Sequence, residues 1–136
     1  MRTSFPPRIS RLLLLLLVAV SPPIGARAPL AGDAEAGAKI YTRCEACHAF
    51  AYDRTGPRHC GLFGRKAGSV PGFDYSDAMK RSGLTWNAAT LDRFLADPMR
   101  TVPGTTMGYA GVTDARERAD LIAYLREQSR GPMCGK

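Results

Sequence analysis

The sequence predicts one small all-α domain that follows a short leader. Helix-capping residues stand ahead of apolar residues spaced three and four apart, near both ends of the chain after residue 28. The segments between them are rich in Gly and Pro, and no run shows the alternating pattern of a strand. A chain of 136 residues, 45% hydrophobic and 23% charged, is not expected to be collagen-like, wholly disordered or multi-domain.

Residues 1–28 have the layout of a cleaved secretory signal peptide. Arg2, Arg8 and Arg11 form a positive start, and the nine residues 12–20 are all apolar before a small-residue cleavage site at 26–28. A bilayer-spanning helix needs about 20 apolar residues, so the alternative, an uncleaved membrane anchor, is disfavoured. Cleavage would leave a domain of residues 29–136, without stable membrane insertion, in the oxidising periplasm.

The net charge of the chain says little about its partners. The whole sequence carries +7, but four of its basic residues precede position 29, and residues 29–136 hold 15 basic against 12 acidic residues, or +3. A surplus this small makes no case for phosphate binding, so no nucleic-acid partner is expected.

The first and last helices have the strongest signals. Asp33 can cap a first helix whose small and apolar residues recur at helical spacing: Gly37, Ile40, Tyr41 and Cys44. Near the C-terminus, Asp114 and Glu117 form a capping box. An apolar stripe follows the box: Leu121, Ile122, Tyr124 and Leu125. Gly131-Pro132 ends this last helix.

Two shorter helices are expected between them. One runs from about Ser76 to Ser82 and is closed by Gly83; the other begins near Asn87 and ends before Pro98. Residues 49–74 and 97–113 remain as loops. Loops this long are unusual in so small a domain unless something other than backbone pairing organises them. A large apolar cofactor would do so.

Cys44-Glu45-Ala46-Cys47-His48 has the C-x-x-C-H pattern of c-type haem attachment. Two thiols three residues apart lie on one helical face, so both can add to vinyl groups along one porphyrin edge. His48 would then ligate the iron as a neutral imidazole. A thioredoxin-like dithiol would need a strand–helix unit, and a zinc half-site would need further ligands, a pattern that His59 and Cys60 do not supply. We therefore expect one covalent haem c.

A second iron ligand is suggested by Met107. It follows the rigid turn Val102-Pro103-Gly104-Thr105-Thr106, far along the chain from His48. A thioether is a soft ligand that favours ferrous iron and raises the reduction potential. The alternative is a gap-filling core methionine, and spacing alone does not decide between the two.

Several short stretches of sequence, in order along nearly the whole domain, match the pattern of a known protein family. They are 37–41 with the C-x-x-C-H motif, 55–57 through 61–66, 72–78, 83–86, Val102-Pro103-Gly104-Thr105 with Met107, and 118–125. Together they resemble the class I cytochromes c, closest to the branch of bacterial cytochrome c2 and mitochondrial cytochrome c.

The resemblance implies a role for each residue around the haem. Met107 would be the axial ligand opposite His48, and the Pro57 carbonyl would hold the His48 ring. Other residues would contact the haem or its propionates, or bond within its pocket: Arg65, Tyr75, Ser76, Trp86, Phe94 and Thr105. Gly37 and Tyr41 would pack against Leu121 and Tyr124, where the terminal helices cross.

Three departures from the family pattern stand out. Phe94 and Met79 replace a common tyrosine and asparagine, which predicts a drier pocket and a methionine sulfur without its usual hydrogen bond. Thr106 replaces a lysine that often serves docking. A weak basic face could still come from four residues: Arg43, Arg54, Lys80 and Arg81.

The third departure concerns Cys60 and Cys134, which lie outside the haem motif. In the family fold the end of the last helix passes near the loop that holds position 60, so the resemblance implies a Cys60–Cys134 disulfide. Its loop of about 75 residues would add on the order of 3–4 kcal/mol. The alternative is two free thiols.

We therefore expect a monomeric protein with a cytochrome c fold of three to five helices around one haem. It is expected to act as a soluble periplasmic electron carrier and not as an enzyme. Its transient partners would be a quinol-oxidising cytochrome complex and a terminal oxidase, reaction centre or dehydrogenase. The alternatives are a haem peroxidase or ligand sensor with a labile Met107, and a thiol oxidoreductase using Cys44 and Cys47. His59 is expected to face solvent, which would leave no distal acid–base pair.

Overall fold

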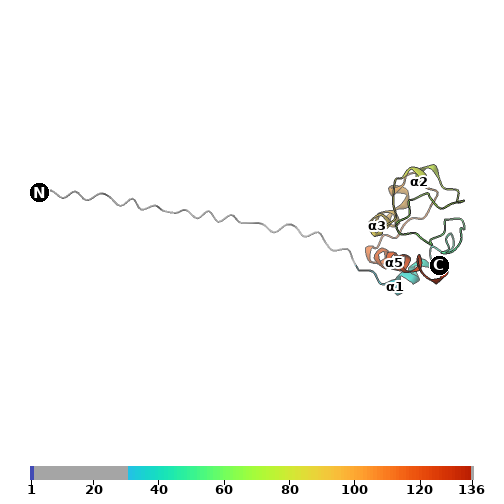
Figure 1. Cartoon of the computed structure of the whole chain (residues 1–136), viewed down its shortest axis with the longest axis horizontal. Helices are drawn as coiled ribbons and strands as arrows, with labels where there is room; N and C mark the ends of the chain where they lie inside the picture. Colours follow the sequence, from blue (N-terminus) through green and yellow to red (C-terminus); the bar gives the residue numbers. More distant parts are fainter. Residues whose placement is uncertain (2–30, 136) are drawn as a thin grey trace.

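The structure is a computed structural model that describes Met1 and residues 31–135. The predicted signal peptide, beyond Met1, lies outside the described residues. The described part contains five α-helices and a terminal 3-10 turn: α1 (Ala34–Tyr41), α2 (Asp77–Arg81), α3 (Ala88–Ala96), α4 (Pro98–Thr101), α5 (Ala115–Gln128) and η1 (Pro132–Cys134) (Figure 1). Its extended backbone pairs at one isolated antiparallel bridge, between Lys66 and Thr85. The all-α prediction is confirmed.

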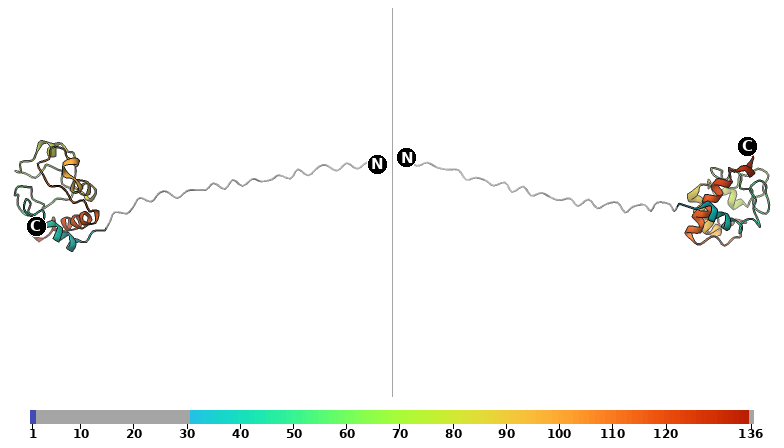
Figure 2. Two further views of the ribbon diagram at one scale, coloured as in Figure 1. Left: turned by 180° about the vertical axis from the view of Figure 1, so that it is seen from behind. Right: turned by 90° about the horizontal axis from the view of Figure 1, so that it is seen from below.

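Helices α1 and α5 pack side by side and close one end of the domain (Figures 1 and 2). The close approach is possible because Gly37 has no side chain: a Cβ there would overlap the backbone carbonyl of Asp120. Beside this contact the rings of Tyr41 and Tyr124 lie 5.3 Å apart, centroid to centroid. Leu121 is fully buried beneath them. The crossing implied by the resemblance is therefore present.

Local capping accounts for the helix starts. Asp33 accepts hydrogen bonds from two backbone N–H groups at the start of α1, and Asn87 exchanges bonds with Thr90 in a reciprocal capping box at α3. The expected box at α5 is only half formed. Asp114 accepts from the Glu117 N–H at 2.8 Å, whereas the Glu117 carboxylate instead pairs with Arg43.

Two boundaries differ from the prediction. α1 ends at Tyr41, so the haem-type motif lies beyond it in a series of turns and not on the helix. The predicted loop 97–113 contains the short helix α4. Asp97 ends α3 in an extended conformation and at once caps α4, where its side chain accepts from the Arg100 N–H. Pro98 is tolerated there because the first residue of a helix needs no N–H.

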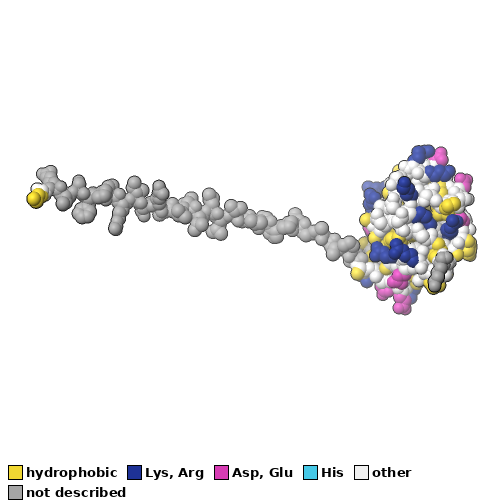
Figure 3. Space-filling view, viewed as in Figure 1, with side chains coloured by type: hydrophobic (Ala, Val, Ile, Leu, Met, Phe, Trp, Pro, Cys, Tyr) yellow, Lys and Arg dark blue, Asp and Glu magenta, His cyan; other side chains and the backbone are white. Residues whose placement is uncertain are grey.

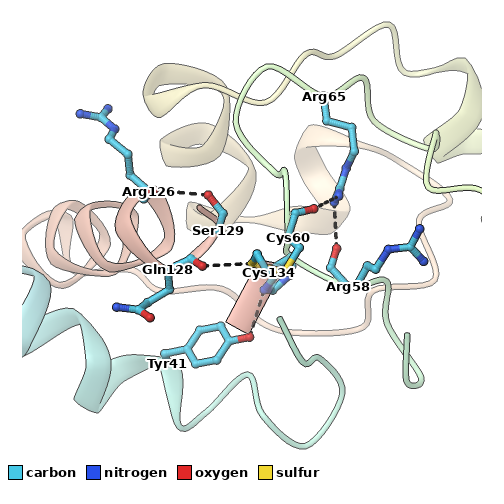
Figure 4. Close-up of a disulfide and its surroundings, with 9 residues drawn as sticks. Tyr41, Arg58, Cys60, Arg65, Arg126, Gln128, Ser129 and Cys134 are labelled. Carbon is cyan, nitrogen blue, oxygen red and sulfur yellow. Dashed lines mark hydrogen bonds between the residues drawn. A yellow bond between two sulfur atoms is a disulfide. The ribbon is translucent and has the colours of Figure 1, made fainter. Parts of the chain in front are cut away.

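The Cys60–Cys134 disulfide is formed and joins η1 to the loop after the haem-type motif, with the two Cα atoms 5.2 Å apart (Figure 4). A backbone hydrogen bond from Gly61 N–H to the buried Ser129 carbonyl, 2.9 Å, runs beside it. The pairing implied by the resemblance is thus confirmed, and it ties the C-terminal end of the fold to the wall of the central cavity.

Candidate functional site: a haem-type cavity

A cavity of about 450 Å³ occupies the centre of the domain. Its walls come from α1, α2, α3 and α5 and from the two long loops, so the loops are organised around it. Most of the lining is apolar, with leucine side chains from three segments: Leu62, Leu91, Leu95, Leu121 and Leu125. A cavity of this size and lining suits a large, flat, apolar cofactor.

The cavity brings together ten of the eleven predicted site residues: Cys44, Cys47, His48, Pro57, Arg65, Tyr75, Trp86, Phe94, Thr105 and Met107. Ser76 is not among the lining residues. Its hydroxyl instead accepts from the Met79 N–H at 3.2 Å and caps α2. The individual roles of all eleven residues stay predictions.

His48 is held as a neutral ligand-type imidazole. Its Nδ1 lies 2.8 Å from the Pro57 carbonyl, which can only accept, so Nδ1 carries the proton and Nε2 keeps a free lone pair. Burial lowers the pKa of His48, which favours the neutral form. Gly56 backs the ring so closely that a Cβ there would overlap it. The ring therefore has one tautomer and little room.

The two motif cysteines take part in no disulfide and lie in the turns that follow α1. The N–H groups of Cys47 and His48 both donate to the Cys44 carbonyl, at 3.0 and 2.9 Å, which keeps the motif in a tight turn. Burial raises the pKa of the Cys44 thiol to about 11. Reactive redox cysteines have lowered pKa values, so this environment disfavours the thiol oxidoreductase alternative.

Arg65 provides a test of whether the cavity fits haem. Its Nη1 and Nη2 donate to the carbonyls of Cys60 and Arg58, at 2.7 and 2.9 Å, but its buried Nε has no hydrogen-bond partner. Burial lowers the pKa of Arg65, but a guanidinium keeps its proton at neutral pH. A buried donor of a charged group is costly when it has no acceptor, and an anionic group would supply one. A haem propionate, near Tyr75 and Trp86 on the same wall, fits that need.

Met107 lies in a turn that two local hydrogen bonds stabilise. Its N–H donates to the Thr105 hydroxyl at 3.2 Å, and Thr105 N–H donates to the Val102 carbonyl at 3.0 Å. The nearby wall is apolar, because Phe94 and Met79 are both buried there, with the Phe94 ring 5.0 Å from that of Trp86.

His59 was missed as a site residue, and the expectation that it faces solvent is wrong. The residue lines the cavity, and its ring stacks on that of His48 with centroids 4.3 Å apart and planes at 22°. The backbone N–H groups of His59 and Cys60 donate to the carbonyls of Ala49 and Phe50. These bonds hold the loop around His59 against the segment after the motif, with the His59 side chain in the cavity wall. The sequence signal was a histidine two residues after Pro57 and beside a bridged cysteine.

Comparison with known proteins identifies the family. A sequence model described as "Cytochrome c" matches residues 34–129. Cytochrome c2 of Rhodomicrobium vannielii is 47% identical over 106 residues, covering 76% of this chain and 85% of the relative. Cytochrome c type-1 of Ascaris suum is 46% identical, covering 75% and 94%. The solved structure of cytochrome cH from Methylobacterium extorquens superposes with a TM-score of 0.68 at 48% identity, covering 70% of this chain and 98% of that one.

The chain belongs to the cytochrome c family. It has the class I fold, and its cofactor is haem c. Proteins of this family carry electrons and are not enzymes. Residues 31–135 hold no group of three or more His, Cys, Asp or Glu side chains placed to share a metal ion. Within the described part, no helix has the length and apolar character to cross a membrane.

Proposed function

We propose that this cytochrome c is a soluble, monomeric periplasmic carrier of single electrons with His48 and Met107 as axial ligands. The observation that carries the proposal is the cavity itself, which unites a C-x-x-C-H motif, a neutral histidine with a free Nε2 and a methionine from a distant turn. The signal-like leader supports the periplasmic location, with the exported chain beginning at Pro29.

Haem c would supply one-electron chemistry at iron. The residues of this chain that would hold it are Cys44 and Cys47 through thioethers, His48 and Met107 through their lone pairs, and Arg65 by charge. Pro57 keeps the His48 ring in one tautomer, and the leucine-lined wall would keep water away from the bound haem. Because both ligands would stay in place in either oxidation state, little of the protein would rearrange during transfer.

The proposed partners are a quinol-oxidising cytochrome complex together with a terminal oxidase, a reaction centre or a periplasmic dehydrogenase. Docking would be transient and close to Cys47, the more exposed of the two motif cysteines. Three of the four expected basic-face residues are ion-paired, Arg43 with Glu117, Lys80 with Asp74 and Arg81 with Asp77. Figure 3 shows basic and acidic side chains interspersed on one face. Such a surface gives weak electrostatic steering.

Replacing Met107 by alanine tests this assignment. Met107→Ala should keep its covalent haem, lose the weak far-red sulfur-to-iron band of the ferric protein and bind carbon monoxide readily when reduced. Met99→Ala is the matched control, because Met99 is 58% exposed, and it should behave as the wild type.

Two outcomes would contradict the proposal. A Met107→Ala variant that keeps the far-red band would exclude Met107 as the ligand. Rapid carbon monoxide binding by the wild type would instead favour the ligand-sensing or peroxidase alternative.

A further inference from the structure

His59 forms a polar pair with Tyr41 on the His48 side of the cavity. The Tyr41 hydroxyl and His59 Nδ1 are hydrogen-bonded at 3.1 Å, and the two rings meet edge to face at 5.8 Å. Tyr41 is the last residue of α1, and His59 directly precedes Cys60 of the disulfide, so the pair links the helix to the disulfide-bonded loop (Figure 4). The pair is therefore fixed in place.

The surroundings of His59 keep it uncharged. Burial lowers the pKa of His59 well below its ordinary value, and the neighbouring His48 and Arg65 act in the same direction. A neutral imidazole can stack on a second imidazole without charge repulsion. It remains more polar than a hydrocarbon side chain in the same place.

The bond between His48 and Pro57 does not by itself fix the ligand. The hydrogen bond sets the direction of Nδ1–H, and Gly56 confines the ring where it passes closest. The stacked ring of His59, 4.3 Å away and nearly parallel, covers a face of the His48 ring and restricts its tilt further. Tyr41 in turn holds the His59 ring through the hydrogen bond to Nδ1. Besides Pro57 and Gly56, a chain of two contacts that starts in α1 therefore helps to orient His48.

We propose that His59, held by Tyr41, is a positioning residue for the His48 ligand: it fixes the plane of the His48 ring and lowers the reduction potential of the haem. The inference rests on the proposed ligation by His48. A polar group beside the ligand stabilises the more highly charged ferric state better than an apolar side chain does. Loss of one hydrogen-bonded polar group is expected to change the ferric–ferrous equilibrium on the order of threefold to tenfold. For a one-electron couple, this is about 28–59 mV at 59 mV per tenfold change.

Three variants test the inference in the haem-loaded protein. His59→Phe keeps a ring for stacking but removes both nitrogens, and Tyr41→Phe removes only the hydroxyl. Tyr124→Phe is the matched control, because its ring belongs to the same cluster, 5.3 Å from that of Tyr41, and makes no hydrogen bond to His59. The readouts are the reduction potential and the chemical shifts of the His48 ring protons in the diamagnetic ferrous protein.

We expect His59→Phe and Tyr41→Phe to raise the potential and to shift the His48 ring signals, while Tyr124→Phe leaves both unchanged. If His59→Phe does not take up haem, Tyr41→Phe alone carries the test. Wild-type values in Tyr41→Phe and His59→Phe, or an equal shift in Tyr124→Phe, would overturn the inference. A wild type without signals from a ligated His48 would instead overturn the proposed function on which it rests.

Discussion

Removing the Cys60–Cys134 disulfide should cost this domain a large part of its stability. The bond closes a loop with a sequence separation of 74 residues. The chain-entropy estimate for a loop of that length is about 4 kcal/mol of unfolding free energy. The folded state should survive, because the bond from Gly61 N–H to the Ser129 carbonyl still holds the loop against the end of α5. The stability is therefore lost mainly because the unfolded chain, without the disulfide, gains conformational entropy.

The assay is guanidinium unfolding of the haem-loaded double variant Cys60→Ser/Cys134→Ser, followed by far-UV circular dichroism. With a slope of about 3 kcal/mol per M, a loss of about 4 kcal/mol lowers the midpoint by about 1.3 M. Met133→Ala is the control, since Met133 lies on the same turn and is 53% exposed. A double variant whose midpoint matches that of the control would refute the reasoning.

Two further substitutions probe the helix crossing and the methionine side of the cavity. Gly37→Ala should lower the unfolding free energy by about 2–3 kcal/mol in the same denaturant assay, because the added Cβ overlaps the backbone of α5. The control is Lys39→Ala on the same helix, where the side chain is exposed. It should change the unfolding free energy by less than about 0.5 kcal/mol. Phe94→Tyr should raise the reduction potential measured by redox titration, because a new hydroxyl can donate to the Met107 sulfur and weaken its donation to iron. Phe63→Tyr, outside the cavity lining, should leave the potential unchanged, and equal potentials in all three proteins would contradict the hydrogen-bond argument.

The helices were predictable wherever their signals are local. Asp33, Asn87 and Asp114 each bond to an N–H within the next three residues, so a few letters of sequence carry the information. Helix α4 was not predicted, because Pro98 was interpreted only as the residue before which α3 must end. In the structure Pro98 is also the first residue of α4. The half-formed box at α5 depends on Arg43, which lies 74 residues away in the sequence.

The candidate site was predictable in its motif residues but not in its supporting contacts. The cysteines and His48 follow from a pentapeptide, whereas Met107 and Arg65 needed the family resemblance to be assigned. The position of His59 follows from neither source, because its ring lies against a residue 11 positions earlier and bonds to another that is 18 positions earlier. Contacts of this kind arise only when loops fold around a common cavity.

The most direct test of the electron-carrier account is the optical spectrum of the purified, exported protein in both oxidation states. The account predicts a sharp α-band from the ferrous form, as expected for a haem with two thioether bonds. It also predicts a weak far-red band from the ferric form, which reports sulfur on iron. A colourless protein would contradict covalent haem binding, and a coloured protein without the far-red band would contradict ligation by Met107.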